Sequence, residues 1–77
     1  MTRVKLNKYL AEDLITSKMR VLQQYIDEIL NRWNEISSKN FLEKARNGIH
    51  ENAEDDAIEL RQLLADYIKL QEILNNL

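Results

Sequence analysis

The stretch that decides the fold is residues 57–77, which read AIELRQLLADYIKLQEILNNL. It contains no glycine or proline, and most of its residues are strong helix formers. Its main apolar residues recur at alternating spacings of three and four, which places them in one stripe along a helix: Leu60, Leu63, Tyr67, Leu70, Leu74 and Leu77. Leu64, Ile68 and Ile73 widen the stripe, so the apolar arc covers roughly 200°, against about 100° for a helix resting on one neighbour. We therefore expect this helix to have partners on two sides.

The composition narrows the class of protein. The chain has 77 residues, of which 44% are apolar and 31% charged, and its formal net charge is −2. These values suit a single folded helical domain over residues 1–77. One glycine, no proline and no cysteine argue against a sheet, a disulfide framework and a thiolate metal site. Because a chain this short buries only about 60% of its unfolded surface, self-association is an expected source of further stability.

Residues 2–36 carry two apolar stripes. The first contains Leu6, Leu10 and Leu14, with Tyr9 beside them; the second runs from Ile15 to Ile36 and includes Tyr25 and Trp33. On one continuous helix these stripes would point roughly 150° apart. We predict a break at Thr16-Ser17, because both residues favour helix caps. The alternative is one unbroken helix from about residue 3 to residue 36.

Loop signals divide the second half of the chain. Residues 37–40 (SSKN) read as a loop, and Asn40 with Glu43 has the spacing of a capping box that begins a short helix. Asn47-Gly48 is a stop signal, because glycine tolerates the left-handed position after a helix; alternatively, Gly48 kinks one helix from 41 to 76. Asn52 is the expected cap of the last helix, with three acidic residues in the first turn.

These elements predict an all-α fold, a small bundle of three to four helices. Two long helices, at about 17–36 and 53–76, are expected to pack antiparallel, and self-association completes the bundle as a two-fold dimer. The expected interface is the leucine stripe of the last helix together with Trp33 and Tyr25, since aromatic residues on apolar stripes often anchor interfaces.

No catalytic, cofactor or metal site is expected. Ser37 and Ser38 have no general base near them in the sequence. His50 and Glu54 are four residues apart and could hold a divalent ion weakly on a helix, but a helix start at Asn52 would break that geometry, so we expect His50 to lie in solvent. For three arginines, Arg32, Arg46 and Arg61, salt bridges to acidic side chains are favoured over an anion pocket.

The basic residues of the first half could contact phosphate: Arg3, Lys5, Lys8, Lys18 and Arg20. However, Glu12 and Asp13 interrupt the run, and the isoelectric point of about 5.3 is far below that of a typical nucleic-acid-binding domain. A solvated face is the favoured interpretation.

Residues 40–46 (NFLEKAR), followed by a long leucine-rich helix, resemble the helical domain of GINS-type replication subunits. The resemblance covers about half of the chain, and we transfer no residue role from it. The sequence favours a non-enzymatic interaction module, such as a small adaptor, regulator or accessory subunit that binds itself or a larger protein. The alternative is a nucleic-acid-associated accessory factor that uses the basic N-terminal segment. No apolar run approaches the ~20 residues of a membrane span, so we expect a cytoplasmic protein.

Overall fold

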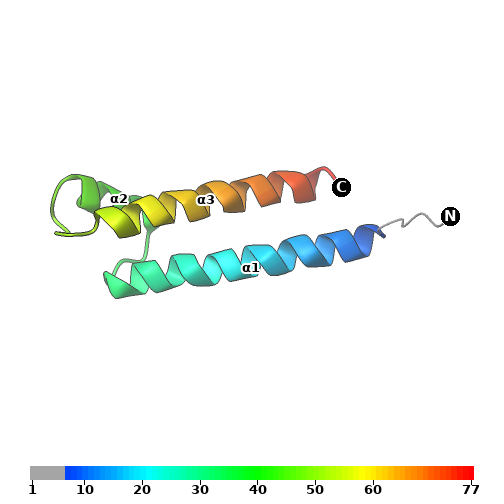
Figure 1. Ribbon diagram of the computed structural model, residues 1–77, viewed down its shortest axis with the longest axis horizontal. Coiled ribbons are helices and arrows are strands. Elements are labelled where there is room, and N and C mark those ends of the chain that lie inside the picture. The colour runs from blue at the N-terminus through cyan, green and yellow to red at the C-terminus, as the bar shows by residue number, and fades with distance from the viewer. Residues whose placement is uncertain (1–6) are drawn as a thin grey trace.

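The computed structural model describes residues 7–77. Helix α1 spans Lys8–Arg32, α2 spans Ser38–Arg46 and α3 spans Glu54–Asn75. Figure 1 shows α1 and α3 lying side by side and running in opposite directions, with the short α2 at the end of the molecule where the chain turns back. The predicted all-α class is confirmed.

Helix α1 is continuous through Thr16 and Ser17, so the predicted break there is wrong. The Thr16 hydroxyl donates to the carbonyl oxygens of Glu12 and Asp13, at 2.8 and 3.2 Å. A threonine that bonds back to the preceding turn is accommodated inside a helix rather than capping a new one. The change in direction between the two apolar stripes therefore reflects two different faces of one helix. Leu6, which belongs to the first stripe, lies outside the described residues.

Helix α1 ends at Arg32, four residues before the predicted end. Asn34 adopts a left-handed φ of 56°, and the Glu35 amide donates to the Leu30 carbonyl at 2.8 Å. The Asn34 amide donates to the Asn31 carbonyl at 3.2 Å. This pair of bonds around a left-handed residue is a Schellman motif, which satisfies the last carbonyls of the helix and turns the chain away.

Helix α2 begins at Ser38, and its cap is Ser37 rather than the predicted Asn40. The Ser37 hydroxyl accepts a hydrogen bond from the Asn40 amide at 3.2 Å. Gly48 follows the helix with φ +80°, and the Ile49 amide donates to the Lys44 carbonyl at 2.9 Å. The predicted stop at Gly48 is confirmed, and the alternative of one kinked helix from 41 to 76 is wrong.

Helix α3 begins one residue later than expected and without a side-chain cap. Asn52 adopts a left-handed φ of 61° in the connection, and Ala53 occupies the cap position with no side-chain hydrogen bond. The prediction that Asn52 caps this helix is therefore wrong. Ala53 is 1% exposed, so packing of a small residue against the core takes the place that a polar cap would need. The predicted acidic first turn is confirmed as Glu54, Asp55 and Asp56, and it complements the positive end of the helix dipole.

The core lies between the three helices near the end of the molecule that α2 covers. Phe41 from α2 and Leu60 from α3 are fully buried at 0% exposure. They pack in one cluster whose other buried members are Leu22, Ile26, Ile29, Leu30, Ala53, Ala57 and Leu63. Beyond Leu63, the inward-facing residues of α3 (Tyr67, Leu70 and Leu74) are only half-buried. Burial is therefore densest where a third helix is present; farther along the hairpin, Met19 of α1 is also buried, at 8% exposure.

Candidate functional site

Besides the residues that it buries in the core, helix α1 carries a row of residues that its own chain leaves exposed. This row, which we call the α1 stripe, consists of Leu10, Leu14, Lys18, Val21 and Tyr25, which recur at spacings of four, four, three and four and so share one face. The four apolar side chains are 49%, 59%, 39% and 47% exposed in chain order. Lys18 is the single charged residue of the stripe.

This stripe faces away from α2. Thr16, Gln23 and Leu30 are spaced by seven residues and therefore lie along one side of α1. On that side Leu30 lines a surface hollow together with Ile36, which belongs to the connection leading into α2. At 100° per residue, Leu14 lies roughly 160° around the helix from Thr16. The exposed stripe is thus on the opposite side of α1.

Helix α3 carries a matching stripe, which we call the α3 stripe. It consists of Glu59, Leu63, Asp66, Leu70 and Ile73 at spacings of four and three, and Leu77, just beyond the end of the helix, continues the spacing. Ile73 and Leu77 are 45% and 42% exposed, Leu70 is half-buried and Leu63 is buried. Arg61 marks the side of α3 that faces α2, because it lines hollows together with α2 residues. Leu70 follows Arg61 by nine residues, which is about 180° around the helix. This stripe therefore also faces away from α2.

The two stripes lie beside each other and form one surface, which we call the uncovered face. Arg32 of α1 and Asp56 of α3 form an ion pair with a distance of 2.7 Å between Nη1 and Oδ2, and this pair shows which residues of the two antiparallel helices lie side by side. Leu14 precedes Arg32 by 18 residues and Leu74 follows Asp56 by 18, so both lie at the same level, about 27 Å from the ion pair at 1.5 Å per residue. The uncovered face consequently runs along most of both long helices.

The structure divides the predicted interface residues into two groups. Leu60 is fully buried and Trp33 is half-buried against the core of its own chain. Tyr25, Leu63, Leu70 and Leu77 belong to the uncovered face, and Tyr67 and Leu74 are half-buried. The residues that sequence reasoning left out of the interface are those of the α1 stripe other than Tyr25. Their spacing is visible in the sequence, but the predicted break at Thr16-Ser17 separated them into two elements.

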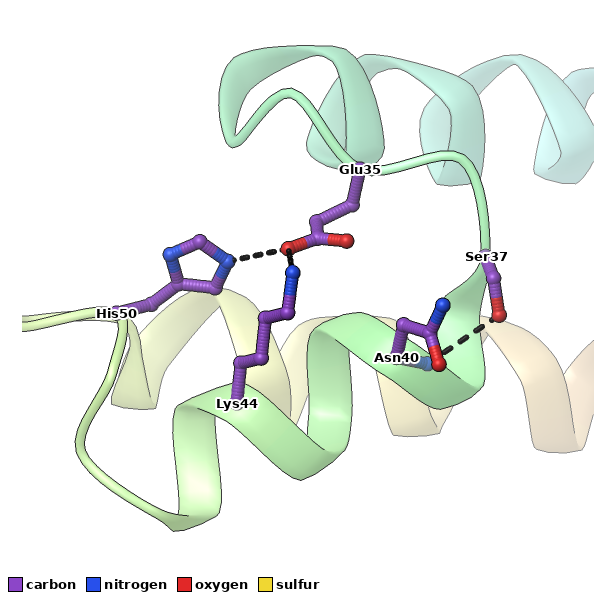
Figure 2. A network of polar contacts seen from close by, with 5 residues as sticks. All are labelled: Glu35, Ser37, Asn40, Lys44 and His50. Atoms are coloured by element: carbon purple, nitrogen blue, oxygen red, sulfur yellow. Dashed lines mark hydrogen bonds and ion pairs between the residues drawn. The ribbon is translucent and has the colours of Figure 1, made fainter.

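A polar cluster at the turning end of the molecule joins the connections to α2 (Figure 2). The Glu35 carboxylate is buried at 8% exposure. Its Oε2 atom accepts from Lys44 Nζ at 2.9 Å and lies 2.6 Å from His50 Nε2. The His50 ring packs against both Trp33 and Phe41, with centroid distances of 5.2 and 5.7 Å. Glu35 thereby links the α1–α2 connection to α2 itself and to the α2–α3 connection.

Two carboxylates are held in their charged form by this packing. The hydrogen bond from Lys44, followed by that from His50, lowers the pKa of Glu35 below its ordinary value, against the opposing effect of burial. The Trp33 indole N–H donates to Asp56 Oδ2 at 2.8 Å and lowers the pKa of Asp56, and Arg32 adds to this effect. Both groups tie loops or helix ends to the core, so their role is structural.

The prediction that His50 lies in solvent is wrong. Its side chain is only 18% exposed and bonds to Glu35. It does not pair with Glu54 either, so the weak metal site considered from the sequence is not formed. Among residues 7–77, no group of three or more His, Cys, Asp or Glu side chains is arranged to hold a metal ion.

The basic residues of the first segment do not gather into one patch. Three of them, Lys8, Lys18 and Arg20, are exposed on α1. At 100° per residue, Lys8 projects roughly 80° from Lys18 and 120° from Arg20, and Lys18 and Arg20 are roughly 160° apart. Arg3 and Lys5 lie outside the described residues.

Arg46 and Arg61 line an open hollow of about 440 Å³ between α2 and α3, together with Leu42 and Leu64. Both arginines are exposed there, so the hollow is not the buried anion pocket that a helical enzyme would need.

Comparison with known proteins finds no matching family model, no similar curated protein and no similar solved structure. None of the helices in the described part of the chain is both long and apolar enough to cross a bilayer.

Proposed function

We propose that this chain is a non-enzymatic protein–protein interaction module, a small adaptor, regulator or accessory subunit, that acts through the uncovered face. The observation that carries the proposal is the exposed α1 stripe. Four large apolar side chains, Leu10, Leu14, Val21 and Tyr25, stand at helical spacing, each at least 39% exposed. Single exposed apolar residues are ordinary, but contiguous apolar surface on a small protein marks interaction sites.

The α3 stripe extends this surface across a second helix. Leu70, Ile73 and Leu77 lie beside the α1 stripe on the side that α2 does not cover. Two adjacent helices with apolar faces form a shallow groove that suits a further helix or helix pair, as in four-helix bundles. The occupant is either a second copy of the chain, which completes the bundle as expected from the sequence, or a helical surface of a larger protein.

The test is cross-linked affinity capture from the source cell, with two matched variants. Leu14→Asp places a charge on the uncovered face, whereas Ile58→Asp places the same charge at a similarly exposed apolar position (62% against 59%) on another side of α3. We expect the wild-type chain and Ile58→Asp to capture the same proteins, and Leu14→Asp to lose them. Equal capture by both variants would refute the role of the uncovered face.

A further inference from the structure

We propose that the occupant of the uncovered face is a second copy of this chain, packed so that α1 of each copy lies against α3 of the other. This inference rests on the proposed function and specifies its partner. The result is a four-helix bundle in which every neighbouring pair of helices is antiparallel and α2 of each copy lies on the outside.

The symmetry of such a pair determines which helices face each other. Two copies placed face to face are related by a two-fold axis. If this axis runs parallel to the helices, it exchanges α1 with α3 across the interface and leaves the level of every residue along the molecule unchanged. The Arg32–Asp56 ion pair then serves as the reference for positions along both copies.

Exposed apolar residues of the two stripes lie at matching positions along the molecule. Leu14 precedes Arg32 by 18 residues and Ile73 follows Asp56 by 17, so Leu14 of one copy faces Ile73 of the other, with a difference of about 1.5 Å along the helices. Farther from the ion pair, Leu10 lies 22 residues before Arg32, and Leu77 follows the end of α3 on the same side of the molecule. Toward α2, Tyr25 is level with Leu63, which is already buried in the core of its own chain. The exposed apolar residues of the two copies therefore face each other in the half of the hairpin that α2 does not cover.

The charges match in the middle of the stripes. Lys18 is the only charged residue of the α1 stripe, and Asp66 is the closer to it of the two acidic residues in the α3 stripe, with positions along the molecule about 6 Å apart at 1.5 Å per residue. Neither side chain forms a salt bridge within residues 7–77. In the proposed arrangement Lys18 of each copy approaches Asp66 of the other, so the two-fold axis generates two opposite-charge contacts. A two-fold axis perpendicular to the helices would instead place α1 of one copy against α1 of the other. The two facing stripes would then both carry Lys18, with no acidic residue opposite it.

Sedimentation equilibrium of the purified chain and its variants tests the assignment. We expect the wild-type chain to have twice the monomer mass of 9.2 kDa, and Leu14→Asp to raise the dimer dissociation constant about 30-fold or more, as loss of a central interface anchor does. Ile58→Asp should leave the constant unchanged. Circular dichroism of Leu14→Asp should retain the helical spectrum, because Leu14 is 59% exposed in the single chain.

Charge exchange and cross-linking test the orientation. Lys18→Glu and Asp66→Lys should each weaken the dimer about threefold to tenfold, and the double variant should recover it. Because the chain has no cysteine, Lys18→Cys and Asp66→Cys can be mixed and treated with a short thiol cross-linker. We expect a cross-linked heteropair from the mixture and none from Lys18→Cys alone. Cross-linking of Lys18→Cys to itself, or no recovery in the charge-exchange variant, would overturn the orientation.

The outcomes also separate this inference from the proposed function. A wild-type chain that stays monomeric while Leu14→Asp abolishes capture of another protein would overturn the second copy as occupant and leave the interaction module standing. If Leu14→Asp changes neither mass nor capture, both proposals are wrong.

Discussion

Replacing Phe41 by alanine removes the side chain with which α2 enters the core. Phe41 is 0% exposed, and its ring centroid lies 5.8 Å from that of Trp33 and 5.7 Å from that of His50. Truncation of a buried phenylalanine to alanine costs about 3–5 kcal/mol. A single core in a chain of this size supplies about 3–5 kcal/mol in total. The free energy of unfolding of Phe41→Ala should therefore fall close to zero.

Urea denaturation measures this loss by far-UV circular dichroism and by fluorescence of Trp33, the only tryptophan. Protein concentration must be the same for all variants, because dimerisation contributes to apparent stability. Ile36→Ala is the control, since Ile36 is 95% exposed and its truncation should change the free energy by less than about 0.5 kcal/mol. A loss below about 1 kcal/mol in Phe41→Ala would refute the claim that α2 is docked through this residue.

Three further predictions concern the elements that position α2. The free energy of unfolding should fall as the pH drops below 4.5, the ordinary pKa of Glu35, because the pKa of this carboxyl is lowered in the folded state and the unfolded state binds the proton first. When unfolding is measured over a range of acidic pH, Glu35→Gln should flatten this dependence and Lys44→Gln should reduce it. An unchanged pH profile in Glu35→Gln would exclude the polar cluster as the source of the dependence. Ser37→Ala should cost about 0.5–2 kcal/mol by thermal melting, as loss of a helix cap does, whereas no change would mean that the hydroxyl bond to Asn40 is unimportant. Gly48→Ala should cost about 1–2 kcal/mol, because φ is +80° although an added Cβ would meet nothing within 4 Å; a neutral result would argue against the left-handed conformation.

The helical class could be predicted from the sequence because periodicity and composition agree. Residues 57–77 have the spacing, the helix formers and the acidic first turn that α3 uses. The stop at Gly48 was predictable for a similar reason, because glycine is the residue that most readily enters the left-handed conformation. Both features depend on residues that are close together in the sequence.

Features that depend on tertiary packing were missed. Asn34 ends α1 in the same left-handed conformation as Gly48, but asparagine is a weaker signal than glycine, and the apolar stripe continues past it to Ile36. The Glu35–His50 contact joins residues 15 positions apart, and no local pattern indicates it. The break at Thr16-Ser17 was predicted because a change of face resembles a change of element, whereas α1 uses its two faces for different neighbours.

The polar cluster explains how a core of this size keeps three helices together. Glu35 is buried and bonds to two basic side chains from different segments, and no buried side-chain nitrogen or oxygen within the described residues lacks a hydrogen-bond partner. A satisfied network of this kind favours one arrangement of the connections, because alternative packings would leave a buried charge unpaired. The half of the hairpin beyond α2 has no comparable cluster among the residues described.

We infer that the uncovered face binds a second copy of this chain. Sedimentation equilibrium of the unaltered chain over a range of concentrations measures this association. We expect a reversible monomer–dimer equilibrium with a limiting mass of twice 9.2 kDa. A single species of 9.2 kDa at every concentration would contradict it.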